Sequence, residues 1–220
     1  MNQMVKIYLV RHAEAQGNVE EFFQGHIDTD VSEKGRKQLE CLAERFKDIP
    51  IEEVYTSPLR RARATAEAVN KYHGLPLTVD PHIIEIYAGD WEGVRWSELP
   101  EKFPHEYELW SKQINKFKAP HGESTKQVYD RMKLAMRNIA AENNGKTIAV
   151  ISHGMAIKAY LNYADGREWE NYADPGWSDN TAVSLIEYDD ELMPHIIFKN
   201  DSSHLKDGLS TLAVSKWCKK

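Results

Sequence analysis

Cysteine is scarce in this sequence, and long apolar runs are absent. The 220 residues include only two cysteines, Cys41 and Cys218, which lie far apart and form no CxxC pair. This spacing argues against a disulfide framework or a cysteine-based zinc site and fits a reducing compartment. No apolar run approaches the length of a membrane-spanning helix. We therefore expect neither a disulfide-stabilised protein nor a membrane protein.

The sequence also lacks an excess of positive charge. It has 28 Lys and Arg against 34 Asp and Glu, a formal net charge of −6, which argues against nucleic acid or an anionic membrane as a partner. A site for an anionic ligand must therefore be a local basic pocket. Residues 1–10 have neither the basic stretch nor the apolar core of a signal peptide, so we expect a cytoplasmic location.

No internal repeat or Gly/Ser-rich linker interrupts the chain, and we predict a single domain over residues 1–220. Short apolar runs alternate with stretches of helical periodicity. This pattern predicts an α/β protein, a three-layer α/β/α sandwich with a mostly parallel central sheet. The predicted strands are residues 5–10, 53–57, 147–152, 182–188 and 195–198, and the last two could pair as a hairpin. The predicted helices begin near Ser32, Pro58, Ser124 and Met155.

Polar clusters follow three of the predicted strands directly. The three segments are LVRHAE from Leu9, VYTSPLRRA from Val54 and AVISHGMA from Ala149. In open α/β sheets, ligands bind beyond the carboxyl ends of the strands. We therefore expect the three clusters to converge on one site.

Arg11 and His12 follow the first of these strands. A neutral imidazole is a good nucleophile near neutral pH, and the adjacent guanidinium could hold two phosphoryl oxygens. His153 precedes a predicted helix, whose positive end would favour a phosphate beside a protonated imidazole. Gly154 would let the backbone approach closely. Each of these residues could instead be an ordinary polar residue at a strand end.

Three arginines, Arg60, Arg61 and Arg63, lie near the start of the second predicted helix. Helical geometry sends their side chains in different directions, so that at most one or two can face one anion. Arg60 is nearest the predicted helix start, and we assign it to the anion site. We expect Arg61 and Arg63 to be exposed to solvent.

Glu85 lies between an apolar stretch and a glycine-rich turn, in the segment IIEIYAGDWEG. A partly desolvated carboxyl group at this place could act as a general acid. An ordinary strand-end glutamate is the alternative. Glu92 is a second candidate acid, although its neighbours Trp91 and Gly93 favour a packing role in a turn.

Each signal is weak alone, but together these segments resemble the histidine phosphatase superfamily, which includes the cofactor-dependent phosphoglycerate mutases. The resemblance extends over nearly the whole chain. The matching segments are LVRHAEAQGN, QGHIDTDVSEKG, YTSPLRRARATA, EIYAGDWEG, HGES and VISHGMAIKAYL.

The resemblance implies a role for each matching residue. His12 would be the nucleophile that becomes phosphorylated, and Glu85 would protonate the leaving oxygen. The phosphate pocket would consist of Arg11, Arg60 and His153. The positions near the bound phosphate or substrate are Asn18, Gln24 and Gly25. The cationic groups of Arg11, Arg60 and His153 would stabilise the transferred phosphoryl group, so we expect neither a metal nor another cofactor.

Ala13 departs from the pattern of the family, which usually has glycine after the histidine. A methyl group needs some room and disfavours a positive φ. It leaves the nucleophile and its charge partners intact. We therefore expect an effect on the geometry of the loop and not on the chemistry.

Residues 94–119 are expected to form a small cap or lid. Mutases of the family have an extended basic insertion here, whereas this segment is compact and nearly charge-balanced, which favours the broad-specificity phosphatase branch. Its aromatic residues either form the core of the cap or partly line the mouth of the pocket. They are Trp96, Phe103, Tyr107, Trp110 and Phe117.

The sequence thus predicts a metal-independent phosphatase that hydrolyses small organic phosphate monoesters through a phosphohistidine on His12. The first alternative is a cofactor-dependent phosphoglycerate mutase, which would return the phosphoryl group to a sugar-acid hydroxyl. The second is a non-catalytic module that binds phosphorylated ligands. In each case the partner is a small phosphate ester.

Overall fold

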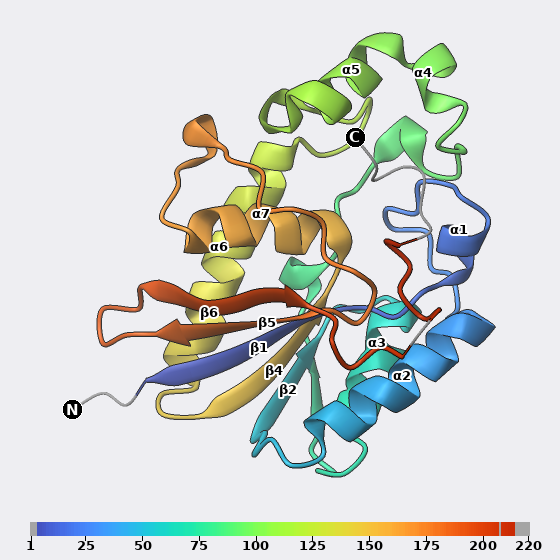
Figure 1. Cartoon of the computed structure of the whole chain (residues 1–220). Helices are drawn as coiled ribbons and strands as arrows, with labels where there is room; N and C mark the ends of the chain where they lie inside the picture. The colour runs from blue at the N-terminus through green and yellow to red at the C-terminus, as the bar shows by residue number, and fades with distance from the viewer. Residues whose placement is uncertain (1–3, 207, 214–220) are drawn as a thin grey trace.

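The computed structural model describes residues 4–206 and 208–213. A six-stranded sheet with the order β3-β2-β4-β1-β5-β6 forms its centre, with helices on both faces (Figure 1). The strands are β1 (Val5–Arg11), β2 (Glu53–Thr56), β3 (Leu77–Val79), β4 (Thr147–Ser152), β5 (Val183–Tyr188) and β6 (Pro194–Asp201). The predicted α/β/α sandwich is confirmed.

The sheet is mostly parallel. β1 pairs with β4, and β2 pairs with both β4 and β3, in parallel registers. β5 is antiparallel to β1 and to β6, so β5 runs against the direction of the other strands. The predicted hairpin is therefore present, whereas the short edge strand β3 was not predicted.

Alternate residues of the central strands enter two separate cores. Ile148 and Val150 pack on one face of the sheet, and Ala149 and Ile151 pack on the other, all four fully buried. This period of two is the direct consequence of the pleat. The first core includes residues of α6 (Thr125–Glu142) and α7 (Gly154–Ala164), and the second includes residues of α2 (Glu33–Phe46) and α3 (Arg60–Val69).

Serine residues begin two of the long helices, as predicted. The Ser32 side chain accepts a hydrogen bond from the backbone N–H of Gly35 at the start of α2. Ser124 and Gln127 form a capping box at the start of α6. α3 begins at Arg60, with Leu59 as its N-cap. The shorter helices are α1 (Gln16–Val19), η1 (Pro81–Ile83), η2 (Gly89–Trp91), α4 (Leu99–Lys102), α5 (Pro104–Lys112), η3 (Ile114–Lys116) and η4 (Trp169–Asn171).

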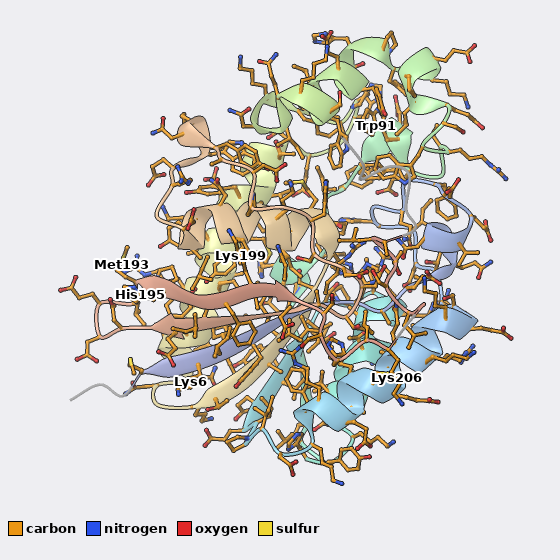
Figure 2. All side chains as sticks on the ribbon, in the orientation of Figure 1. Lys6, Trp91, Met193, His195, Lys199 and Lys206 are labelled. Atoms are coloured by element: carbon orange, nitrogen blue, oxygen red, sulfur yellow. The ribbon has the colours of Figure 1, made fainter. Side chains whose placement is uncertain are left out.

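The elements α4, α5 and η3 extend the first core beyond the sheet, at the top of Figure 1. Trp91, labelled in Figure 2, is completely buried beneath them. Its ring centroid lies 4.7 Å from that of Phe117 and 5.5 Å from that of Phe23. Aromatic packing of this kind contributes about 0.5–1.5 kcal/mol per pair beyond the area that is buried.

Cys41 lies on α2 and is a free thiol, and Cys218 lies outside the described residues. Within residues 4–206 and 208–213, no helix has both the length and the apolar character needed to cross a bilayer.

The two cores predict how leucine substitutions will affect stability. Leu42 is fully buried in α2, whereas Leu134 in α6 is 61% exposed. Leu42→Ala should lower the free energy of unfolding by about 2–5 kcal/mol because it leaves a cavity. Leu134→Ala, the matched control, should change it by less than about 0.5 kcal/mol. Urea denaturation of both variants measures the difference, and equal losses would contradict this description of the core.

Candidate active site

The carboxyl ends of β1, β2 and β4 meet at one edge of the sheet. Arg11 lies opposite Ser152, and Thr56 lies opposite Ile151. The next residues along the three strands, which include His12 and His153, are therefore neighbours. The ring centroids of these two histidines are 5.1 Å apart, and the predicted convergence of the three clusters is found.

A cavity of about 60 Å³ lies beside the two histidines. It contains seven of the nine residues that the sequence assigned to the site: Arg11, His12, Asn18, Gln24, Gly25, Glu85 and Gly154. The other residues that line it are Phe22, Phe23, Arg61, Trp96, Trp110, Met155 and Trp177. His153 is next to His12 and is fully buried, and Arg60 is outside the cavity.

A hydrogen bond fixes the tautomer of His12. Its Nδ1 lies 2.7 Å from the carbonyl oxygen of Ala13. Because a carbonyl can only accept, Nδ1 is the protonated nitrogen and Nε2 retains its lone pair. Burial, with the nearby charges of Arg61 and Arg11, holds the pKa of His12 well below its usual value. The imidazole is therefore neutral at neutral pH, as a nucleophile must be.

The alanine at position 13 fits its place without strain. Ala13 is fully buried, and its φ is not positive. Its backbone N–H donates to the hydroxyl of Thr65, at 3.0 Å. The methyl group therefore leaves the backbone of the loop in an ordinary conformation, and its carbonyl remains available to His12.

His153 is held by the side chain of the residue that directly follows β2. Its Nε2 lies 2.7 Å from the hydroxyl of Ser57. Burial, with the charges of Arg61, His12, His26 and Arg11, lowers the pKa of His153 well below its usual value. In the absence of a ligand the imidazole is therefore neutral at neutral pH, and a protonated His153 beside a bound phosphate stays a prediction. A phosphate dianion beside the ring would favour its proton uptake.

The assignment of Arg60 to the pocket is wrong, and Arg61 occupies that place. Arg60 is 55% exposed and forms ion pairs with Asp28 and Asp30. Arg61 is only 1% exposed and lines the cavity. Because successive residues of a helix point about 100° apart, the start of α3 at Arg60 turns this side chain outward and the next one inward.

Backbone carbonyls orient the guanidinium group of Arg61. It donates to Gly25 O at 2.8 Å and to Ile27 O at 2.7 Å. Burial lowers the pKa of Arg61 to about 10, against the attraction of nearby acidic groups that include Glu85. Arg61 therefore keeps its positive charge at neutral pH.

Glycine is required at position 25. Its φ is +50°, and a Cβ atom there would lie 2.3 Å from a carboxylate oxygen of Glu92. Glu92 itself accepts hydrogen bonds from the backbone N–H groups of His26 and Ala88. Glu92 thus has the packing role that its neighbours suggested, and the turn that it stabilises places the carbonyl of Gly25 against Arg61.

Two amide side chains also line the cavity. The Asn18 Oδ1 accepts from the backbone N–H of Ala15 at 3.0 Å, and the Gln24 Oε1 accepts from the hydroxyl of Thr29 at 2.6 Å. Both bonds use the amide oxygen. They orient each side chain and leave its NH₂ group as a donor for an anionic ligand.

The carboxylate of Glu85 lies at the start of α7. Backbone N–H groups donate to it from Ile86 at 2.9 Å and from Met155 and Ala156 at 3.1 Å. Donors at a helix N-terminus stabilise a negative charge. Glu85 lines the same cavity as His12, so the carboxyl group and the imidazole share one space.

Arg131 holds the segment that bears Glu85, a contact that the sequence did not reveal. Its guanidinium group donates to the carbonyls of His82, Ile84 and Glu85 and pairs with Glu123 at 3.0 Å. The HGES motif, which includes Glu123, is thus a support for the backbone around Glu85. An arginine inside an amphipathic helix gives no sign of this role.

The loop of residues 174–181 supports the site from the other side, and the sequence did not reveal it either. The carbonyl of Ser178 accepts from the Arg11 guanidinium, and the Asn180 side chain donates to the carbonyl of His12 at 2.9 Å. Asp179 accepts from the backbone N–H groups of Thr211 and Leu212. The only signal in the sequence is a polar, glycine- and proline-containing stretch before a strand.

Among residues 4–206 and 208–213, no group of three or more His, Cys, Asp or Glu side chains is placed to hold a metal ion. The polar groups of the cavity instead include a neutral imidazole, two guanidinium groups and a carboxylate. Together with the position of the cavity beyond parallel strands, these groups define a site suited to phosphoryl transfer.

The sequence matches the histidine phosphatase superfamily (branch 1) over residues 7–201. The chain belongs to this family. It is 32% identical to phosphoserine phosphatase 1 of Hydrogenobacter thermophilus, over 92% of this chain and 95% of that protein. It is 31% identical to phosphoglycerate mutase-like protein 4 of Arabidopsis thaliana, over 92% of this chain and 87% of that protein.

Solved structures agree with this assignment. The protein YhfR of Bacillus stearothermophilus superimposes with a TM-score of 0.87 at 29% identity, over 92% of this chain and 100% of that one. Mycobacterial hydrolase 1 superimposes with a TM-score of 0.83 at 25% identity, over 91% and 100%. The predicted family and the predicted class of enzyme, a phosphatase, are confirmed.

The two adjacent arginines give a matched pair of substitutions. Arg61→Gln should lower kcat/KM for phosphate esters about 100- to 1000-fold, because it removes a preorganised charge from the cavity. Arg60→Gln removes an exposed ion pair and should change kcat/KM less than about twofold. Steady-state kinetics on both variants test this, with melting temperatures to verify folding. A larger loss from Arg60→Gln would restore Arg60 to the site.

Buried neutral histidines predict a loss of stability in mild acid. His12 and His153 have lowered pKa values, and burial lowers the pKa of His204 to about 4. An unfolded chain protonates histidine near pH 6.5, so below that pH the unfolded state binds more protons and is favoured. Stability should be constant from about pH 8 to 7 and fall below about pH 6.5.

Urea midpoints between pH 8 and pH 5 measure this dependence. His204→Gln should make the decline shallower. The exposed residue His105 provides the control, because His105→Gln should leave the slope unchanged. A midpoint that stays constant down to pH 5 would show that the histidines titrate normally in the folded protein.

Proposed function

We propose that this protein hydrolyses small organic phosphate monoesters through a phosphohistidine intermediate on His12. The main support is the arrangement of one cavity, in which the unprotonated Nε2 of His12 is accompanied by Arg11, Arg61 and Glu85. These groups supply a nucleophile, two cations for the phosphoryl oxygens and a proton donor. The substrate would enter with its phosphoryl group between the two guanidinium groups.

In the first step, the lone pair of His12 Nε2 attacks phosphorus and the bond to the ester oxygen breaks. Glu85, in its protonated form, gives its proton to that oxygen, so the alcohol leaves uncharged. Arg11 and Arg61 stabilise the charge on the three remaining phosphoryl oxygens.

In the second step, water attacks the phosphorus of phosphohistidine while the ionised Glu85 accepts a proton from it. The bond between phosphorus and Nε2 breaks, and phosphate and neutral imidazole are formed. The hydrogen bond from Nδ1 to the Ala13 carbonyl stabilises the ring during both steps. Asn18, Gln24 and the backbone at Gly25 and Gly154 would contact the phosphate or the ester.

Hydrolysis is favoured over mutase activity by the charges of residues 94–119. A mutase must hold the carboxylate of a sugar acid, and it must exclude water while the phosphoryl group is on histidine. Two of the lysines in this segment are paired with its own glutamates one helical turn away, Lys102 with Glu98 and Lys112 with Glu108. They are poorly placed to grip a substrate carboxylate.

A non-catalytic binding module is a weaker alternative. Such a protein needs cationic groups for phosphate but no nucleophile and no acid. Here Nε2 of His12 and the carboxyl group of Glu85 share the same cavity, and relatives are named as phosphatases. The lone pair on Nε2 of a neutral imidazole is a nucleophile and not a donor for an anion, so its presence in the cavity favours catalysis.

A His12→Ala substitution tests the mechanism directly. Release of phosphate should fall at least about 1000-fold, because the nucleophile is lost. Rapid acid-free denaturation during turnover of a ³²P-labelled ester should trap label on His12 of the wild-type protein. The assay should contain EDTA, and activity should survive it. Label on another residue would overturn the proposal.

The same preparation should be incubated with 3-phosphoglycerate and a trace of 2,3-bisphosphoglycerate. Fast isomerisation without release of phosphate would identify a mutase. Saturable binding of phosphate without turnover of any ester would identify a binding module.

A further inference from the structure

The cavity beside His12 has room for a phosphoryl group and little else. Its volume is about 60 Å³, whereas sites that enclose small organic ligands usually measure about 300–1,000 Å³. The alcohol part of an ester must therefore extend into a neighbouring space. Where that space lies, and which groups line it, determine the class of substrate.

A second cavity of about 780 Å³ adjoins the first. Trp96, Trp110 and Trp177 line both cavities, so the three indole rings form the boundary between them. Tyr107 and Tyr172 add further aromatic surface to the larger space. We name this larger space the leaving-group cavity.

The three tryptophan rings of the boundary pack against one another and against Phe23. Trp110 is only 9% exposed, and its ring centroid lies 5.9 Å from that of Trp177 and 6.1 Å from that of Trp96. The ring of Phe23 packs against Trp110 from the other side at 5.2 Å. Rings that are already ordered lose little entropy when a ligand stacks on them.

An ion pair between a buried lysine and an exposed aspartate holds Trp177 in position. Lys158 of α7 is 2% exposed, forms a salt bridge with Asp174, and its ammonium nitrogen lies 4.5 Å from the centroid of the Trp177 ring. Asp174 and Trp177 belong to the same loop, so the lysine ties that loop to α7. The cation–π contact adds to this attachment.

Each lysine among the described residues that line the leaving-group cavity has an acidic partner. The charged residues among its described lining are Lys112, Lys158 and Asp174. Lys112 pairs with Glu108, and Lys158 pairs with Asp174. A carboxylate entering near Lys158 would lose much of its hydration and would have to compete with Asp174, whereas Lys112, whose side chain is 70% exposed, offers only a charge screened by solvent.

We propose that the leaving-group cavity binds an uncharged, planar ring, so that the preferred substrates are ring-bearing phosphate monoesters and not phosphorylated amino or sugar acids. This inference rests on the proposed phosphatase function. The phosphoryl group lies against His12, and the ring stacks along Trp96, Trp110 and Trp177. Specificity then comes from apolar area and aromatic stacking. The relatives named for phosphoserine would differ from this chain in that respect.

Three esters with the same CH₂–O–P linkage separate binding from intrinsic reactivity. They are 2-naphthylmethyl phosphate, ethyl phosphate and O-phosphoserine, whose leaving alcohols are alike in kind. We expect kcat/KM for the naphthylmethyl ester to exceed the other two by at least about tenfold. Equal values, or a preference for phosphoserine, would overturn the inference. Phosphate release from no ester would instead contradict the proposed function.

A substitution in the boundary provides the second test. Trp177→Leu keeps an apolar side chain but removes the ring, and it should reduce the preference for the naphthylmethyl ester about fivefold. Lys158→Met should reduce the same preference, because Trp177 loses its attachment. A preference that is unchanged in both variants would contradict this account.

Phe46→Leu is the matched control. Phe46 is fully buried in the second core and lines neither cavity, so its loss should lower the melting temperature without changing the ratio of kcat/KM values. The ratio, which is measured on the folded fraction of each variant, is insensitive to lost stability. If the ratio changes in this control as well, the reduced preference for the naphthylmethyl ester comes from a general loosening of the structure and not from the boundary.

Discussion

Six backbone pairs align β1 with β4, from Lys6 opposite Thr147 to Arg11 opposite Ser152. This parallel register brings His12 beside His153, although 140 residues of chain separate them. A shift by one residue would turn every side chain of the strand to the other face of the sheet and would exchange the two cores. Burial of the strands on both faces therefore sets the register of β1 and β4, and with it the relative position of His12 and His153.

The electrostatic state of the cavity follows from that burial. The guanidinium groups of Arg11 and Arg61 donate to backbone carbonyls, which orient a cation without neutralising it. The same cations, with desolvation, keep His12 and His153 neutral. Positive charge held in a site of low dielectric attracts a phosphate dianion more strongly than it would in water. One arrangement thus supplies both the affinity for phosphate and the unprotonated nucleophile.

Local patterns in the sequence were sufficient for most strands and for the helix starts at Ser32 and Ser124, because each of these depends on neighbours in the chain. His12, His153 and Glu85 were weak signals alone, and their roles came from the resemblance of several segments together to a known family. To choose between Arg60 and Arg61, the start of the helix must be known to within one residue, and the sequence does not define it so closely. α3 begins at Arg60 with Leu59 as its N-cap, and this start directs Arg61 into the cavity. Asn180 and Arg131 were missed because their partners are far away in the chain; Asn180 and His12, for example, are 168 residues apart.

The loop of residues 174–181 connects chemistry with specificity. Trp177 lines the leaving-group cavity, and the next residue, Ser178, orients the Arg11 guanidinium through its carbonyl. If a leaving group packs on Trp177 as proposed, it would restrict the backbone of this loop next to the acceptor of Arg11. Binding energy from the non-reacting part of the substrate would then help to orient the Arg11 guanidinium.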